Sequence, residues 1–493
     1  MLMPMPFLFA VLAGAASVLA YAPFEWFWLM PLCWGSWYAL LRQKEVRPGR
    51  AALLGWSWGA AALFAGLCWL VVALNRYGGL SAPLSVALIM LFCAALALIY
   101  IASASALFAR LRPTHWLLRT LFAAACWTWF ELLRGQIFPS FPWLAIGYTQ
   151  TPPSPLAGWA AILGVYGVGF LLAWTSALLV EAWRLPACHR SALGLALLPW
   201  LSGAGLRQIA WSEPTGEPLR VALIQTNVPQ DQKWNGERMG EWLSLHLELL
   251  RNNPAQLTVM PETTLPLLAE HLPVGYLDAL KAQAQSAGGD VVLGVFTRDD
   301  GRVYNSAISL GTHASQRYSK NHLVPLGEYV PWGFQWFLDL AKIPMANQTP
   351  GGERQPLMQI GGQRIAMNIC YEDAFGEELR RALPEATLML NISNLAWYGN
   401  SHAQPQHLQI SRMRALESAR PQLRATNTGM TGVVLPDGSV SHLLPAFTRG
   451  AVAAEVRGYT GATPFVQLGD WPIKLLCVLI FGAVVLDRWR WRV

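Results

Sequence analysis

The sequence predicts a bundle of about eight membrane-spanning α-helices combined with one layered α/β domain. Apolar residues make up 54% of the 493 residues and charged residues only 13%, about half of the usual charged share of roughly 25%. Seven apolar runs lie before residue 210, and an eighth lies close to the C-terminus. The long polar segment between them alternates strand-like and helix-like patterns. Together these observations argue against a wholly soluble protein.

The apolar runs have the length and the low charge that a helix needs to cross a bilayer. We expect spans at residues 7–20, 26–41, 51–74, 83–108, 117–133, 158–183, 191–206 and 471–487. The first, second and seventh runs are short. The first run also resembles a signal peptide that would be cleaved after Ala22. However, the residues before it carry no Lys or Arg, so we expect it to be retained.

Basic residues are distributed unevenly among the segments that join these runs. With a cytoplasmic N-terminus, the inner segments hold twelve Lys and Arg residues and lie at 42–50, 110–119, 184–190 and 488–493. The outer segments before residue 207 hold only Arg76 and Arg134, which is the positive-inside pattern. It predicts a seven-helix bundle at 1–206, a periplasmic α/β domain at 207–470, and an eighth helix with a tail at 471–493. Both termini would be cytoplasmic, at a bacterial inner membrane.

Several function classes find no support in the sequence. The net charge is +7, but there is no basic stripe with interleaved aromatic residues, so we expect no nucleic-acid partner. The nine His are scattered and no HExxH or paired CxxC occurs, so we expect no metal and no cofactor. The GxSxG pattern of a serine nucleophile elbow is matched by Gly55-Trp56-Ser57-Trp58-Gly59. However, a strand should precede such an elbow. Inside an apolar helical run, its two glycines indicate helix packing instead.

Residues 219–457 alternate short apolar runs with helical patterns, which predicts a layered α/β domain with buried strands. The expected strands are 219–226, 257–260, 291–296, 303–310, 363–369 and 387–392. The expected helices are 236–250, 274–287, 374–382 and 403–419.

Three polar segments at the ends of these runs could form one catalytic centre. Glu262 follows a strand directly, Lys320 lies in a second polar segment, and Cys370 follows a third strand. Cys370 is also the only cysteine in the long polar part of the chain. Singly, these residues could be a helix cap, a surface charge and a small core residue. Together at strand ends, they favour nucleophilic catalysis by a cysteine.

The order and spacing of these residues resemble the nitrilase superfamily, whose members use a Glu–Lys–Cys triad in an αββα sandwich. With eight flanking spans, the resemblance narrows to the apolipoprotein N-acyltransferases and covers nearly the whole chain. It is carried by residues 322–331 (HLVPLGEYVP), by Cys370-Tyr371-Glu372, and by the outer-loop residues 141–148.

The resemblance implies a two-step acyl transfer. Cys370 would take an acyl chain from a phospholipid, which is phosphatidylethanolamine in the best-known members. The α-amino group of the S-diacylglyceryl-cysteine of an apolipoprotein would then accept that chain. Glu262 would be the general base, and Lys320 would stabilise the oxyanion together with the backbone N–H of Tyr371. Glu328 and Glu372 would support these groups, or would form only a structural ion pair.

Other residues are weaker candidates for contacts with lipid. Trp234 and Trp397 would line an acyl pocket or belong to the core. Glu131 and Arg134, at the outer end of a span, would support a lipid headgroup or form a local salt bridge. The apolar stretch 331–340 would be a lid or would pack permanently.

Two other functions stay open at this point. One is a membrane-anchored nitrilase-type amidase with water as the acceptor. The other is a non-catalytic module that binds lipoproteins.

Overall fold

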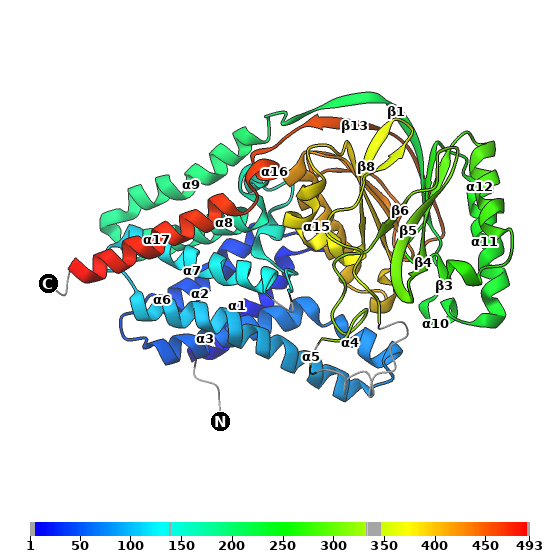
Figure 1. The fold of residues 1–493 in the computed structure, drawn as a ribbon. Helices are drawn as coiled ribbons and strands as arrows, with labels where there is room; N and C mark the ends of the chain where they lie inside the picture. Colours follow the sequence, from blue (N-terminus) through cyan, green and yellow to red (C-terminus); the bar gives the residue numbers. More distant parts are fainter. Residues whose placement is uncertain (1–4, 138–139, 332, 334–346, 491–493) are drawn as a thin grey trace. The chain divides into compact units, whose positions relative to one another are not determined.

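The computed structural model describes residues 5–137, 140–331, 333 and 347–490. The chain divides into two compact units (Figure 1). The first, which we call the helical unit, consists of Met1–Val71, Ala82–Ala210 and Gln467–Val493. The second, which we call the α/β unit, consists of Val72–Ser81 and Trp211–Val466. Each unit is described by itself below.

Helices of the helical unit occur at each of the expected apolar runs. They are α1 (Met5–Ala16), α2 (Leu29–Leu41), α3 (Pro48–Leu67), α5 (Ala82–Leu96), α6 (Ser103–Leu111), α7 (Trp116–Gln136), α8 (Ala160–Arg184), α9 (His189–Leu206) and α17 (Trp471–Arg490). Among the described residues, two continuous helical stretches are long and apolar enough to cross a membrane, Ala82–Leu111 and Pro155–Arg184. The pair Pro48–Leu67 and Leu70–Tyr77, bent by 62°, would make a third if it is one span. The count of eight spans therefore stays a prediction.

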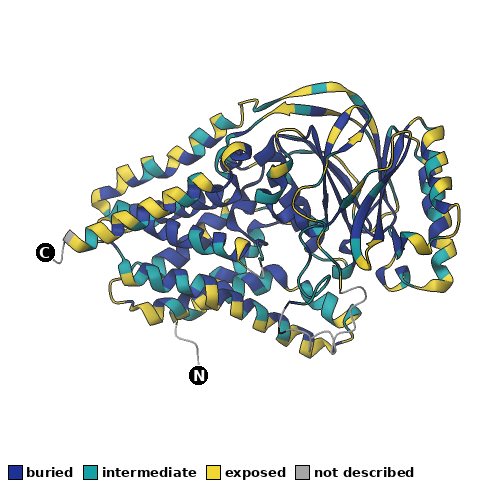
Figure 2. Ribbon diagram, viewed as in Figure 1, coloured by how far each residue is buried: buried dark blue, intermediate teal, exposed yellow. Residues whose placement is uncertain are grey.

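The surface of the helical unit carries most of the exposed large apolar side chains. Among the described residues, the α/β unit contributes only Val274, Leu443 and Phe447 to this group. The helical unit contributes the others, with α17 alone exposing Leu475, Val478, Leu479, Val485 and Leu486. Figure 2 shows α9 and α17 with many exposed residues along their length. Such extended apolar exposure is uncommon on soluble proteins and is typical of a surface that contacts lipid.

The GxSxG segment lies inside α3, as its helical pattern predicts. A Cβ atom at Gly55 would lie 1.9 Å from Ser105 Oγ, and one at Gly59 would lie 2.5 Å from the Ile101 side chain. The Ser57 hydroxyl donates to the Leu53 carbonyl one turn earlier, at 2.8 Å. Helix packing therefore explains this motif, and Ser57 has no elbow geometry.

Two mixed β-sheets form the α/β unit. One has the strand order β13-β1-β2-β4-β5-β6, with β3 also paired to β4, and the other has the order β12-β11-β10-β9-β8-β7. The first sheet contains β1 (Ser212–Gln225), β2 (Leu257–Val259), β3 (Leu265–Leu268), β4 (Asp290–Asp299), β5 (Arg302–Gly311), β6 (Arg317–Ser319) and β13 (Gly450–Gly461). The second contains β7 (Met358–Ile360), β8 (Gln363–Ile369), β9 (Leu388–Ser393), β10 (Gln422–Thr426), β11 (Gly432–Val434) and β12 (Val440–Leu443).

The two sheets pack face to face and helices cover their outer faces. A single buried cluster joins side chains of both sheets, among them Leu223 and Val259 of the first and Ile365, Leu390 and Leu423 of the second. Helices α11 (Met239–Asn252) and α12 (Tyr276–Ser286) share a second cluster with the outer face of the first sheet. Helix α15 (Ala403–Ser418) packs on the second sheet. The unit is thus a four-layer αββα sandwich (Figure 1), held by apolar burial between layers.

The expected strands are confirmed, but several other elements were not predicted from the sequence. Strand β10 was not predicted because Gln422 and Arg424 interrupt its apolar pattern. All five of its residues are nevertheless buried. The helix expected at 374–382 is reduced to α14 (Gly376–Leu379) between two 3₁₀ turns. Short helices α10 (Gln230–Lys233) and α16 (Pro464–Leu468) complete the described α-helices, apart from α4 (Leu70–Val72).

We expect Leu390→Ala to lower the free energy of unfolding by about 2–5 kcal/mol, because it leaves a cavity between the two sheets. Leu390 is fully buried there. Leu443→Ala, on the exposed strand β12, is the matched control and should change this free energy by less than about 0.5 kcal/mol. Denaturant unfolding of the purified protein in detergent measures both values. Equal losses would contradict the placement of the core.

Candidate active site

Glu262 is held at the end of the parallel strand β2. Its Oε1 accepts a hydrogen bond from Asn305 Nδ2 at 2.8 Å, and its Oε2 accepts one from the backbone N–H of Asn394 at 2.8 Å. Gly294 of β4 packs directly against this segment, and a Cβ there would lie 2.8 Å from Glu262 Cα. Only glycine allows the two backbones to approach so closely. The carboxylate therefore has a fixed orientation.

Lys320 follows β6 and is fully buried. Its Nζ lies 2.6 Å from Glu328 Oε1 and 3.3 Å from Glu262 Oε1. Burial alone would lower the pKa of Lys320, but the negative charges of Glu262 and Glu328 and the nearby Cys370 raise it well above its usual value. The ammonium is therefore charged at neutral pH, although the side chain is fully buried.

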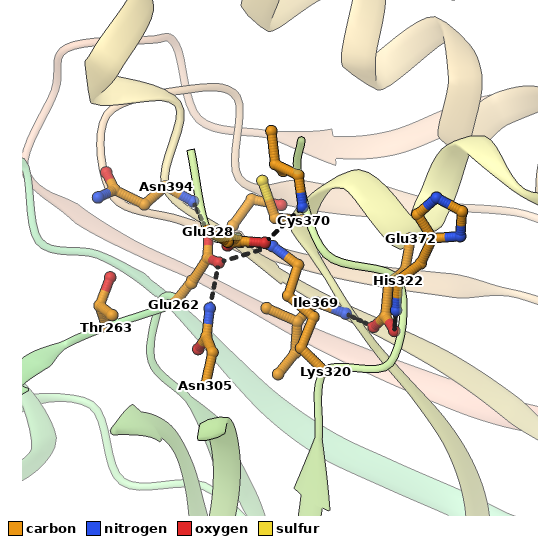
Figure 3. Close-up of polar contacts among 12 residues, drawn as sticks. Glu262, Thr263, Asn305, Lys320, His322, Glu328, Ile369, Cys370, Glu372 and Asn394 are labelled. Carbon is orange, nitrogen blue, oxygen red and sulfur yellow. Dashed lines mark hydrogen bonds and ion pairs between the residues drawn. The ribbon is translucent and has the colours of Figure 1, made fainter. Parts of the chain in front are cut away.

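Cys370 follows β8 and opens the 3₁₀ turn Cys370–Ala374, with a φ of 56°. A residue other than glycine in this left-handed region is strained, and such residues concentrate at functional sites. Figure 3 shows the Cys370 side chain beside Glu262, Lys320 and Glu328. Burial, with the charges of Glu262 and Glu328, raises the pKa of the thiol, while Lys320 lowers it. The thiol is therefore protonated at neutral pH and needs a base before it can attack.

Glu372 ties the lysine segment to the cysteine strand (Figure 3). Its Oε1 accepts from the backbone N–H groups of Asn321 and His322, at 2.7 and 3.1 Å. Its Oε2 accepts from the Ile369 backbone N–H at 2.7 Å. Burial raises the pKa of Glu372 to about 7, against the lowering effect of these hydrogen bonds. Glu372 thus contacts backbone N–H groups and the Tyr318 hydroxyl, whereas Glu328 contacts Lys320 directly.

A cavity of about 160 Å³ lies against these groups. Its polar wall contains Glu262, Glu328 and Cys370, and its aromatic wall contains Trp234 and Trp397. The other lining residues within the described part of the chain are Ala73, Leu74, Tyr77, Gly78, Thr263, Phe296, Asn305, Val324, Gly327, Gln348, Asn394 and Tyr398. Both predicted tryptophans therefore line the same cavity as Cys370.

The segment 72–81 is part of this cavity, although it is remote from the rest of the α/β unit in sequence. The Tyr77 ring lies 5.3 Å from the Trp397 ring in an edge-to-face arrangement, and the Tyr77 hydroxyl donates to the Ala396 carbonyl at 3.2 Å. The sequence predicts residues 72–74 as the end of a span and the rest of the segment as an outer loop. No polar pattern in it signals contact with a distant catalytic residue.

Sequence reasoning also missed Asn305, Asn394 and Lys233. Asn394 follows strand β9, so the strand-end criterion would have found it. Asn305 lies within β5, where a single polar residue gives no such signal. Lys233 is buried, and its Nζ donates to the Glu262 carbonyl and the Thr263 hydroxyl at 3.3 and 3.2 Å. Burial lowers its pKa to about 7.

The other predicted residues belong elsewhere. Glu131 and Arg134 lie on α7 in the helical unit, with 3.7 Å between Glu131 Oε1 and Arg134 Nη2. Glu131 also accepts from the Ile146 backbone N–H at 2.9 Å. The predicted lid at 331–340 lies outside the described residues, apart from Pro331 and Gly333. Within the described part of the chain, no three His, Cys, Asp or Glu side chains are grouped to hold a metal ion.

Residues 13–178 match the family described as apolipoprotein N-acyltransferase N-terminal domain, and residues 220–465 match the carbon-nitrogen hydrolase family. The α/β unit therefore has the nitrilase-like fold. An amidase of solved structure from Nesterenkonia sp. AN1 is 20% identical, with a TM-score of 0.38, over 52% of this chain and 98% of its own.

Two curated relatives match almost the whole chain. The apolipoprotein N-acyltransferase of Nitrosomonas europaea is 41% identical, over 95% of this chain and 95% of its own. That of Ralstonia nicotianae is 42% identical, over 98% of this chain and 93% of its own. At this identity and coverage, the chain belongs to the apolipoprotein N-acyltransferase family.

Proposed function

We propose that this protein is an apolipoprotein N-acyltransferase that works through a thioester on Cys370. It would move an acyl chain from a phospholipid to the α-amino group of the S-diacylglyceryl-cysteine of an apolipoprotein. The observation that carries the proposal is the meeting of Glu262, Lys320 and Cys370 beside one cavity, in a chain that belongs to this family.

In the first half-reaction, Glu262 takes the proton of the Cys370 thiol as the sulfur attacks the ester carbonyl of the phospholipid. The oxyanion that forms is stabilised by Lys320 Nζ and the backbone N–H of Tyr371. When the tetrahedral intermediate collapses, the C–O bond breaks and Glu262 returns the proton to the leaving alcohol oxygen. The products are an acyl-Cys370 thioester and a lysophospholipid. The expected donor is phosphatidylethanolamine.

In the second half-reaction, the neutral α-amino group of the diacylglyceryl-cysteine attacks the thioester. Glu262 accepts a proton from this nitrogen as the C–N bond forms, and the C–S bond then breaks. The departing sulfur takes the proton from Glu262, so the resting thiol is restored. The two half-reactions make a ping-pong cycle in which one carboxylate serves as both base and acid.

The remaining residues have proposed roles that follow from their contacts. Glu328 fixes the Lys320 ammonium, and Glu372 holds the backbone on either side of the triad. Trp234 and Trp397 provide an apolar wall for the end of the acyl chain that carries the carbonyl. Glu131 and Arg134 would support a lipid headgroup.

The same proposal includes the membrane arrangement. Eight spans at 1–206 and 471–493 would anchor the protein in the inner membrane, with residues 207–470 in the periplasm and both termini in the cytoplasm. The apolar exposure of the helical unit and the placement of the basic residues support this arrangement. It suits substrates whose long acyl chains resist leaving the bilayer.

We expect intact-mass analysis of the purified enzyme with phospholipid alone to detect one acyl adduct, which disappears when a diacylglyceryl-cysteine peptide is added. Cys370→Ala should form no adduct. Cys68→Ala, which removes another free thiol outside the α/β unit, is the matched control and should form it normally. An adduct that water discharges as fast as the peptide does would favour the amidase-like hydrolase. Turnover without any adduct would exclude Cys370 as the acyl carrier.

We expect Glu262→Gln to lower kcat by about 10²–10⁴-fold, because the amide cannot accept the thiol proton. The Asn394 backbone N–H can still donate to the Gln carbonyl oxygen. Asn305 can turn its amide so that its Oδ1 accepts from the Gln nitrogen, so the fold should be preserved. Glu248→Gln, an exposed change on α11, is the control and should leave kcat unchanged. Steady-state kinetics with a diacylglyceryl-cysteine peptide measure both, and equal rates for the two variants would exclude Glu262 as the base.

We expect a membrane-impermeant maleimide to label Asp300→Cys in intact spheroplasts and Lys44→Cys only after lysis. Both positions are exposed, and in the proposed orientation, which the positive-inside pattern supports, they would lie on opposite sides of the membrane. Labelling above the wild-type background is the readout. Labelling of Lys44→Cys before lysis, without Asp300→Cys, would reverse the orientation.

A further inference from the structure

The peptide bond between Cys370 and Tyr371 is held by two side chains from other elements. His407 Nε2, on α15, lies 3.2 Å from the Cys370 carbonyl oxygen. Asn391 Nδ2, on β9, donates to the same oxygen at 3.2 Å. Since a peptide unit is planar and trans, the direction of its carbonyl also sets the direction of its N–H. That N–H belongs to Tyr371.

The hydrogen bonds of His407 fix its tautomer. Arg424 Nη2 lies 3.1 Å from His407 Nδ1, and arginine can only donate, so Nδ1 is the acceptor. The proton of the neutral ring is therefore on Nε2, which donates to the Cys370 carbonyl. Asp373 Oδ2 is 3.6 Å from Nε2, too far for a hydrogen bond. Burial, together with the Arg424 charge, keeps the pKa of His407 well below its usual value.

Both donors are themselves fixed by buried neighbours. Arg424 is fully buried and pairs with Asp373 Oδ2 at 2.8 Å. Asn391 Nδ2 also donates to Asn368 Oδ1 at 2.5 Å, and Asn391 Oδ1 accepts from the Ser393 hydroxyl at 2.5 Å. The amide of Asn391 can therefore present only its nitrogen to the Cys370 carbonyl. Neither donor can turn away without breaking a buried hydrogen bond.

We propose that His407 and Asn391 are positioning residues that aim the Tyr371 N–H at the oxyanion formed on the substrate. Cys370 has a φ of 56°, and strained backbone persists only where its surroundings hold it. Two hydrogen bonds to the carbonyl supply that restraint. They also polarise the amide, which makes its N–H a stronger donor. The inference rests on the proposed function, because it assigns partners to the oxyanion donor of that reaction.

The test compares His407→Leu, which has no donor, with His407→Gln, whose amide nitrogen reaches about as far as Nε2. Two single-turnover rates are measured at Cys370 by intact mass, acylation by phospholipid vesicles and alkylation by iodoacetamide. Acylation passes through an oxyanion, whereas alkylation by displacement of iodide does not. We expect His407→Leu to slow acylation about 10²-fold, as loss of an oxyanion donor does, with alkylation changed less than about threefold. We expect His407→Gln to recover acylation to within about tenfold of wild type.

Thermal unfolding in detergent is measured for both variants, since a merely structural role would lower Tm and both rates together. Equal loss of acylation and alkylation in His407→Leu would overturn the inference. So would wild-type acylation in that variant, or the absence of any rescue by His407→Gln at equal Tm. In each of these cases an acyl adduct that depends on Cys370 would leave the proposed function standing, whereas a wild-type enzyme that forms no adduct would overturn both.

Discussion

The candidate active site depends on one buried ammonium between two carboxylates. Removing a lysine from water costs several kcal/mol unless partners compensate, and Glu328 and Glu262 lie 2.6 and 3.3 Å from Lys320 Nζ. Glu262 follows β2, Lys320 follows β6, and Glu328 lies in the segment beyond β6. The ion pairs therefore also fix these two strand ends and that segment relative to each other. Glu262 and Glu328 also bring negative charge close to Cys370. This charge, added to burial, raises the pKa of the thiol.

A thiol kept protonated has a consequence for the proposed chemistry. In the proposed mechanism, negative charge develops on the sulfur as its proton moves to Glu262, which becomes neutral. Deprotonation is thereby coupled to attack on the substrate. Oxidation of cysteine follows thiolate character, so in the proposed periplasmic setting a protonated resting thiol would be oxidised more slowly than a thiolate. A permanently ionised cysteine would lack this protection.

The sequence was most informative where burial follows hydrophobicity. Strands β2 and β8 are short apolar runs, so the placement of Glu262 and Cys370 at their ends could be predicted. It was uninformative where polar side chains are buried because they pair with one another. Gln422 and Arg424 on β10 both hydrogen-bond to the buried Asp373, and composition does not reveal such a partner. It also could not place Tyr77 in the catalytic cavity, since that contact joins residues more than 300 positions apart.

The size of the cavity limits what it can hold. At about 160 Å³ it is smaller than the roughly 300–1,000 Å³ of pockets that enclose a drug-sized ligand. On the proposed function, a phospholipid or a diacylglyceryl peptide could place only its reacting end there, and its chains would have to leave past the cavity wall. Part of that wall is the segment 72–81, which follows α3 and the short α4 along the chain and leads into α5 of the helical unit. A soluble hydrolase needs no such segment, because its whole substrate can enter from water. Part of the cavity wall thus continues along the chain into apolar helices. This is consistent with the proposed enzyme, which acts on the reacting end of a lipid substrate while the rest of that substrate stays in the bilayer.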